Sequence, residues 1–142
     1  MNINPNTDDA KQQAQAVMHK FTSNLLEENM EQWISLFDDN AVFEFPYAPK
    51  HFVQVLQGKA AIYEYIKEFP SILRIQHFSS PTIHMTTDPS LFVAEFASKA
   101  QAVSTGKPYN QTYISVIKLK NGKITHYKDY WNPLVALEAL ES

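Results

Sequence analysis

Hydrophobic residues follow a helical period in about the first two fifths of the chain and alternate as in strands over the rest. From Thr7 or Asp8 to about Glu28, apolar residues recur every three or four positions, which predicts one amphipathic helix. Asn29 suits the N-cap of a second, short helix, which the polar segment Asp38-Asp39-Asn40 ends. These two patterns predict a helical hairpin with one face on the core.

The middle of the chain changes its pattern twice. Ala41 to Phe45 alternates as a short strand and ends at a proline, whereas Tyr47 to Gln57 has no clean period and predicts a loop or flap. A third helix is expected to begin near Gly58 and to end before Pro70, which cannot continue it.

The remaining sequence predicts five strands separated by turn residues and then a short helical tail. Consecutive strands with short turns form antiparallel sheets, and the tail, 133–140, is too short to be a stable helix unless it packs on something. The predicted fold is therefore α+β, a single domain over residues 1–142. Its three N-terminal helices are expected to pack on a curved, mainly antiparallel sheet, in a cone that encloses a pocket. The strands are expected at Leu73 to Phe78, Thr82 to Thr86, Leu91 to Val103, Tyr109 to Lys120 and Lys123 to Trp131.

The Asn121-Gly122 pair joins the last two strands and favours a two-residue type I′ turn. Such a turn predicts which residues lie opposite one another. On the last strand Tyr127, Asp129 and Trp131 share one face, because side chains alternate along a strand. The expected pairs are Lys120 with Lys123, Val116 with Tyr127, Ile114 with Asp129 and Thr112 with Trp131.

Asp129 is the main candidate for acid–base chemistry, since aromatic residues stand on either side of it. Apolar surroundings disfavour a carboxylate and raise its pKa towards neutrality, where general acid–base catalysis is effective. The alternative is a structural role in which Asp129 accepts hydrogen bonds from the backbone or from a tyrosine hydroxyl. His77 shares a predicted face with Leu73 and Ile75 and is the candidate for a second acid–base group. Its own alternative is a buried histidine with a satisfied hydrogen bond.

Composition excludes several other kinds of site. The formal net charge is −3 and Arg74 is the single arginine, so no nucleic-acid partner is expected. The chain has no cysteine and three glycines, and its histidines lack ligand spacing, so neither a metal nor a cofactor is expected. The N-terminus is polar and no apolar run has the length of a membrane span, so we expect a cytoplasmic protein without membrane contact.

Several short segments, in this order and spacing, resemble the nuclear transport factor 2-like superfamily, in particular its SnoaL-like and ketosteroid-isomerase-like members. The resemblance covers nearly the whole chain and implies the cone fold. The segments are Val17-Met18 to Phe21, Trp33 to Phe37, Asp39 to Pro46, Gly58 to Ile62, and Gly122-Lys123-Ile124 with Tyr130-Trp131.

The isomerase chemistry of that superfamily does not carry over to this sequence. Ketosteroid isomerases use a tyrosine and a protonated aspartate to hold the oxyanion, and another aspartate as the base. The matching positions here are Phe21, Phe45, and either Ile114 or Ser115, of which the predicted strand pairing favours Ile114. Phenylalanine neither donates nor accepts a proton, so we expect that this protein is not a true ketosteroid isomerase.

The run from Tyr127 to Pro133 instead resembles the terminal strand of the phenazine-biosynthesis A/B group, whose members carry a pocket acid there. This resemblance implies a cofactor-independent isomerase, cyclase or condensation catalyst. It would bind a small apolar carbonyl or imine compound and use Asp129 to shuttle a proton. The expected pocket lining is Tyr127, Trp131, Phe21, Phe45, Tyr65, Phe92, Phe96, Thr112 and Ile114.

The other face of the sheet is expected to be too apolar for solvent, which predicts a homodimer through the sheets. The superfamily resemblance implies the same assembly, and Glu44 and Glu95 are expected on this outer side. Two alternatives to catalysis remain open at this point, a non-catalytic module that binds a hydrophobic ligand and a dimeric interaction protein. The residues expected on the outer face are Leu91, Val93, Ala97, Tyr109, Tyr113, Ser115, Ile117, Ile124, His126 and Tyr130.

Overall fold

The computed structural model describes residues 5–141, with side chains from residue 8 onward. Over this range it contains five helices and seven strands. In chain order they are α1 (Pro5–Leu26), α2 (Met30–Ile34), β1 (Phe37–Glu44), β2 (Val55–Gln57), α3 (Lys59–Ile66), α4 (Phe69–Ile72), β3 (Leu73–Phe78), β4 (Thr82–Met85), β5 (Leu91–Ala102), β6 (Pro108–Lys120), β7 (Lys123–Trp131) and α5 (Pro133–Leu140).

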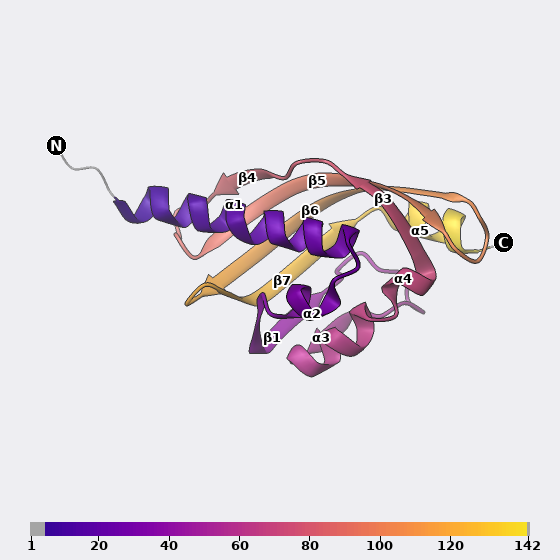
Figure 1. Cartoon of the computed structure of the whole chain (residues 1–142), viewed down its shortest axis with the longest axis horizontal. Helices are drawn as coiled ribbons and strands as arrows, with labels where there is room; N and C mark the ends of the chain where they lie inside the picture. Colours follow the sequence, from indigo (N-terminus) through magenta and orange to yellow (C-terminus); the bar gives the residue numbers. More distant parts are fainter. Residues whose placement is uncertain (1–4, 142) are drawn as a thin grey trace.

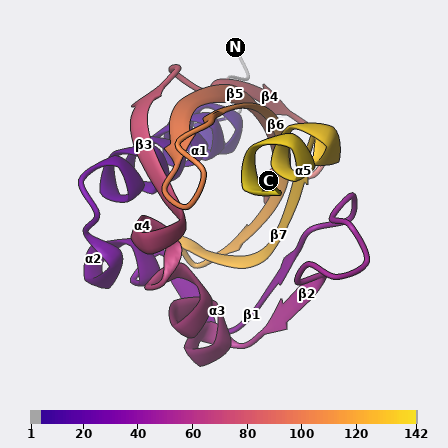
Figure 2. The same cartoon turned by 90° about the vertical axis from the view of Figure 1, so that its right-hand side faces the viewer.

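All seven strands form one strongly curved sheet, as Figures 1 and 2 show. Its order is β2-β1-β7-β6-β5-β3, with β4 also paired to β5. The β1–β7 pair is parallel and every other pair is antiparallel. The sheet curls around a core while α1 to α4 close its open side, so the predicted α+β cone is confirmed.

The helices form where the apolar spacing predicted them. In α1 the buried positions include Ala14, Met18 and Phe21, which lie on the face turned to the sheet. The Asn29 side chain accepts a hydrogen bond from the Gln32 backbone nitrogen at 3.3 Å and so caps α2. No helix among residues 5–141 has both the length and the apolar character that a membrane span requires.

Three local predictions were wrong. The short strand β1 already begins at Phe37, which had been assigned to the second helix, and residues 55–57 of the expected loop pair with β1 as β2. The third helix, α3, does end before Pro70, but a further short helix, α4, was not predicted, and Pro70 lies in its first turn. Proline is tolerated there because the first backbone N–H groups of a helix have no partner within it.

The turn between β6 and β7 has the predicted geometry, with positive φ at Asn121 (53°) and Gly122 (78°), and it pairs Lys120 with Lys123. One residue further the register changes. Leu119 lies opposite Ile124, yet Lys118 lies opposite His126, so Thr125 is an extra residue in β7 and forms a β-bulge.

The bulge changes every later pair by one position. The observed partners are Ile117 with Tyr127, Ser115 with Asp129 and Tyr113 with Trp131, instead of Val116, Ile114 and Thr112. Side chains of β6 that were expected outside therefore point into the cone, since a shift of one residue exchanges the faces. Of the predicted outer-face residues, Tyr109, Tyr113, Ser115, Ile117 and Ile124 are in fact turned inward.

A similar irregularity occurs in β3. Ile75 pairs with Ala100, but His77 already pairs with Lys99, so Gln76 is the extra residue. His77 is exposed as a result, while Ile75 and Phe78 face the interior.

The core has a large cluster under α1 to α3 and a smaller one under α5. In the large cluster the Tyr127 ring is stacked between Phe21 and Phe43, with ring centroids 4.9 Å and 4.5 Å apart. In the smaller cluster, Ala136 and Ala139 pack on residues of β3, β5 and β6. The tail is thus a helix because it packs on the sheet, as its length required.

Candidate functional site

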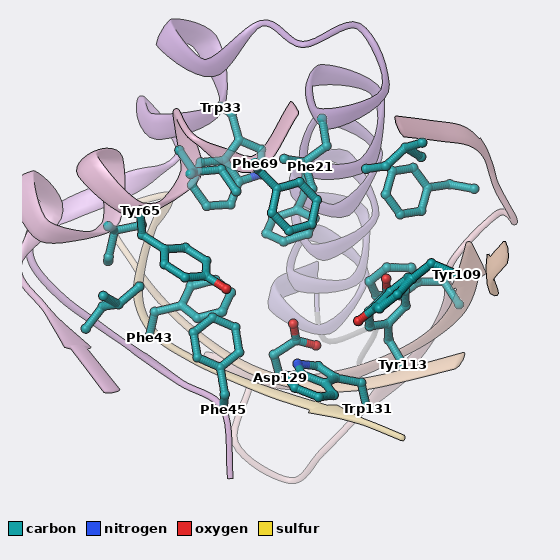
Figure 3. A pocket seen from close by; sticks show the side chains of 17 residues that line it. Phe21, Trp33, Phe43, Phe45, Tyr65, Phe69, Tyr109, Tyr113, Asp129 and Trp131 are labelled. Carbon is teal, nitrogen blue, oxygen red and sulfur yellow. The ribbon is translucent and has the colours of Figure 1, made fainter. Parts of the chain in front are cut away.

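A cavity of about 80 Å³ lies between the helices and the concave face of the sheet. Its walls are mainly aliphatic and aromatic, and all four of α1 to α4 contribute to them (Figure 3). The 17 lining residues are Phe21, Leu25, Trp33, Phe43, Phe45, Leu56, Ile62, Tyr65, Ile66, Phe69, Ile75, Phe78, Phe96, Tyr109, Tyr113, Asp129 and Trp131.

Asp129 is the one ionisable acid among these lining residues, and Figure 3 shows its carboxyl group directed into the cavity. Burial raises the pKa of Asp129 from its usual 3.8 to about 7, and the Ser115 hydroxyl acts in the opposite direction. The residue as a whole is half-buried, and its Oδ1 atom is fully buried. A group with this pKa is divided between acid and base at neutral pH and can therefore act as either.

The surroundings of Asp129 within residues 8–141 leave one oxygen of its carboxyl group without a hydrogen-bond partner. Its Oδ1 atom accepts no hydrogen bond from any residue in the described range. The Ser115 hydroxyl, directly opposite on β6, is the hydrogen-bond partner that lowers the pKa of Asp129, and it also accepts a hydrogen bond of 2.7 Å from the Tyr127 hydroxyl. Most buried polar atoms in proteins are paired, so an unpaired carboxylate oxygen on a residue that lines a cavity is unusual.

Three tyrosines of the same cavity keep their protons at neutral pH. Burial raises the pKa of Tyr65 to about 12, and the charges of Tyr109 and Asp129 add to the effect. Burial likewise raises the pKa of Tyr109 and, more strongly, that of Tyr113, whose hydroxyl is 3.0 Å from the Ser98 hydroxyl. These hydroxyl groups can donate hydrogen bonds, whereas Asp129 is the group that changes its charge near neutral pH.

Trp33 forms part of the opposite wall, on α2 (Figure 3). Its side chain is almost fully buried, at 1% exposure, and its indole Nε1 has no hydrogen-bond partner within residues 8–141. Trp33 Nε1 and Asp129 Oδ1 are the two buried side-chain atoms without a partner in that range.

Six of the residues expected at the pocket border the cavity, and five do not. Tyr127 and Phe92 are fully buried in the surrounding core, while Thr112 and Ile114 are on the outer face because of the Thr125 bulge. His77 is exposed and does not border the cavity, so it is not placed to act there as the second acid–base group. The residues that do border the cavity are Phe21, Phe45, Tyr65, Phe96, Asp129 and Trp131.

The sequence interpretation missed two kinds of lining residue. Tyr109 and Tyr113 were placed outside because no sequence signal gave the register after the bulge. Trp33 falls within the predicted second helix, but the periodicity contains no information on whether its N–H has a partner. The bulge also makes Ser115, and not Ile114, the inward-facing residue at the third ketosteroid-isomerase position.

Metal ligands do not gather in the part of the chain that the structure describes. Across residues 5–141 no three His, Asp or Glu side chains come together as they would to hold a metal ion.

Comparison with known proteins gives both a family and related structures. The SnoaL-like domain profile matches residues 18–127. YesE from Bacillus subtilis is 47% identical over 122 residues, which are 86% of this chain and 83% of YesE. A PhzA/B-like protein from Pseudomonas aeruginosa is 38% identical over 108 residues, 76% of each chain. A Bacillus subtilis crystal structure, provisionally named an isomerase, is 45% identical with a TM-score of 0.89 and covers 92% of this chain and 94% of its own.

Proposed function

Because the chain belongs to the SnoaL-like domain family, we propose that it catalyses a proton transfer of the isomerase or cyclase type on a small molecule. Asp129 is the general acid–base in this proposal. The observation that carries it is a carboxyl group with a pKa of about 7 at the wall of an apolar cavity. The provisional isomerase name of the 45% identical Bacillus subtilis structure is consistent with this reaction class.

The cavity suggests the size and polarity of the substrate. A water molecule needs roughly 10–15 Å³ of cavity volume, so the cavity of about 80 Å³ has room for about six waters. That corresponds to a ligand on the order of six to ten non-hydrogen atoms. The aromatic walls favour an apolar skeleton, and the acid–base group requires one activated position, as in a small carbonyl or imine compound.

The reaction begins with ionised Asp129 accepting a proton from the carbon next to the C=O or C=N group. The electron pair of the broken C–H bond moves towards the oxygen or nitrogen and forms an enolate from a carbonyl compound or an azaenolate from an imine. Asp129, now neutral, returns the proton to the same carbon or to another carbon of the conjugated system, which restores the carboxylate. The apolar walls limit the contact of the intermediate with bulk water, and a proton held on Asp129 can exchange with solvent before it is returned to carbon.

This route differs from that of the ketosteroid isomerases. The three positions that match their catalytic groups carry Phe21, Phe45 and Ser115 on the inner side, and none is an aspartate or tyrosine. We therefore place the acid–base function on β7, at Asp129.

The direct test is α-hydrogen exchange of a small ketone in D₂O, followed by proton NMR. The wild-type protein is expected to accelerate deuterium incorporation into cyclohexanone above the buffer rate. Asp129→Asn keeps the shape but cannot accept the proton, and it should lose roughly 100- to 10,000-fold of that rate. Glu138→Gln, an exposed position on α5, is the matched control and should exchange at the wild-type rate.

Two results would contradict the proposal. If Asp129→Asn exchanged as fast as the wild type, Asp129 would not be the acid–base group. If cyclohexanone and a panel of small ketones and imines bound but never exchanged, the protein would be a binding module for hydrophobic ligands, the alternative that the apolar lining also favours.

A further inference from the structure

We propose that the indole N–H of Trp33 binds the oxygen of the ligand across the cavity from Asp129. Trp33 would thereby select molecules that carry a hydrogen-bond acceptor. This inference rests on the proposed function, because it assumes that the cavity takes a small carbonyl compound.

The aromatic neighbours of Trp33 cannot take the place of an oxygen acceptor for its N–H group, which is unpaired within residues 8–141. Its ring packs against Phe37 at 4.6 Å, Phe21 at 5.3 Å and Phe43 at 6.4 Å between centroids. Phenylalanine rings have no lone pair, and a ring face is a weak acceptor. An indole nitrogen only donates hydrogen bonds, so the Trp33 nitrogen cannot instead accept one from a neighbouring group.

A buried donor without an acceptor is costly and is uncommon in native proteins. Here the two unpaired buried atoms of residues 8–141 are one donor, on Trp33, and one acceptor, on Asp129. Both residues line the same cavity, and they belong to opposite walls, α2 and β7 (Figure 3). A ligand with an acceptor at one end and a transferable proton near it would satisfy both atoms at once.

A carbonyl compound has this polarity. Its oxygen accepts the Trp33 N–H, and the neighbouring C–H group is presented to Asp129. When the proton leaves, negative charge develops on the oxygen, so the hydrogen bond from Trp33 becomes stronger in the transition state. Trp33 would thus contribute to catalysis as well as to binding.

The indole signal of Trp33 gives a direct test. The chain has two tryptophans, so Trp131→Phe leaves Trp33 as the single source of an indole N–H resonance. In this ¹⁵N-labelled variant, cyclohexanone is expected to shift the Trp33 indole proton downfield. Methylenecyclohexane, which has the same skeleton with CH₂ in place of oxygen, should bind without that shift.

Affinities measured on Trp33→Phe in the otherwise native chain complete the test. Loss of one hydrogen bond should weaken cyclohexanone binding roughly three- to tenfold. Methylenecyclohexane should bind as it does to the wild type. Trp33→Phe also removes bulk, because phenylalanine is smaller than tryptophan. As a control for size, benzothienylalanine replaces Trp33 in the Trp131→Phe variant, where Trp33 is the one tryptophan left. The analogue keeps the tryptophan shape without the N–H group and should show the same selective loss.

The outcomes separate this inference from the proposed function. An unchanged indole shift with cyclohexanone bound, or equal weakening for both ligands, would overturn the role of Trp33, even if Asp129-dependent exchange were observed. A selective shift without any exchange would support Trp33 as the acceptor-binding group and would refute catalysis by Asp129. If cyclohexanone did not bind at all, the role of Trp33 would be refuted.

Discussion

The carboxyl group of Asp129 has lost most of its contact with water, and this affects stability as well as chemistry. In the unfolded chain its pKa returns to the ordinary value of 3.8, whereas in the folded protein burial raises it to about 7. Between these values the folded state binds more protons than the unfolded state. Asp129 therefore makes the protein less stable as the pH rises from about 4 to about 7, and the loss is complete above the folded pKa.

This effect predicts different pH dependences for the wild type and Asp129→Asn. A difference of about three pKa units at 1.36 kcal/mol each sets an upper limit of about 4 kcal/mol. The free energy of unfolding of the wild type, relative to the variant, should fall by up to that amount between pH 4 and pH 8. Urea denaturation at several pH values measures it. Parallel curves for the two proteins would show that Asp129 has an ordinary pKa in the folded state.

The β-bulge at Thr125 positions the whole site at the level of secondary structure. The hairpin has a tight Asn-Gly turn at one end and an inward-facing Asp129 further along β7, and the extra residue makes the two compatible. With a regular ladder after this turn, Ile124 and Tyr127 could not both face the core, because three positions apart on a strand means opposite faces. Both are nevertheless fully buried, at 0% exposure.

Deletion of Thr125 should therefore be strongly destabilising. The shorter strand would turn Tyr127 away from Phe21 and Phe43, and loss of a large buried aromatic side chain costs about 3–5 kcal/mol. Thr125→Ala keeps the bulge and removes one hydrogen bond of 3.2 Å to the Lys118 carbonyl, so about 1 kcal/mol is expected. Thermal and urea unfolding compare the two variants. A deletion variant as stable as Thr125→Ala would show that the bulge does not determine the register.

The bulges also mark the limit of prediction from this sequence. Apolar periodicity was sufficient for the longer helices, most strands and the cone, because burial of a whole face leaves a repeated signal. A single inserted residue leaves no such signal, so the inward positions of Tyr113 and Ser115 and the exposure of His77 were not predicted. Asp129 and Trp131 were placed correctly, since both lie beyond the bulge on the strand whose face was inferred from its aromatic neighbours.

For the molecule as a whole, the outer face of the sheet remains the surface that we propose for homodimer formation. Some residues predicted on this face in fact point inward and are left out here. The apolar residues that do lie on it include Leu91, Val93 and Ala97 of β5 and Ile114 of β6, which is 45% exposed. Two His–Glu pairs, His84 with Glu95 and His126 with Glu44, lie on the same side. The face is thus less apolar than the sequence suggested, with hydrogen-bonded His–Glu pairs among the aliphatic side chains.

A charge at the centre of this face should prevent association. Ile114→Lys places an ammonium group where an isologous interface would bring two copies together, and burial of an unpaired charge is strongly unfavourable. Light scattering after size-exclusion chromatography should give a dimer for the wild type and a monomer for the variant. Leu134→Lys, at a 69% exposed position on α5, is the control and should remain dimeric.

The same variant tests whether the cavity depends on assembly. Ile114 points away from the cavity, whereas its neighbours Tyr113 and Ser115 point towards it and Asp129. If the monomeric variant still exchanges the α-hydrogens of cyclohexanone at the wild-type rate, the site is complete within one chain. A monomeric wild type, or a dimeric Ile114→Lys protein, would contradict dimer formation through this face, because neither fits an interface centred on Ile114.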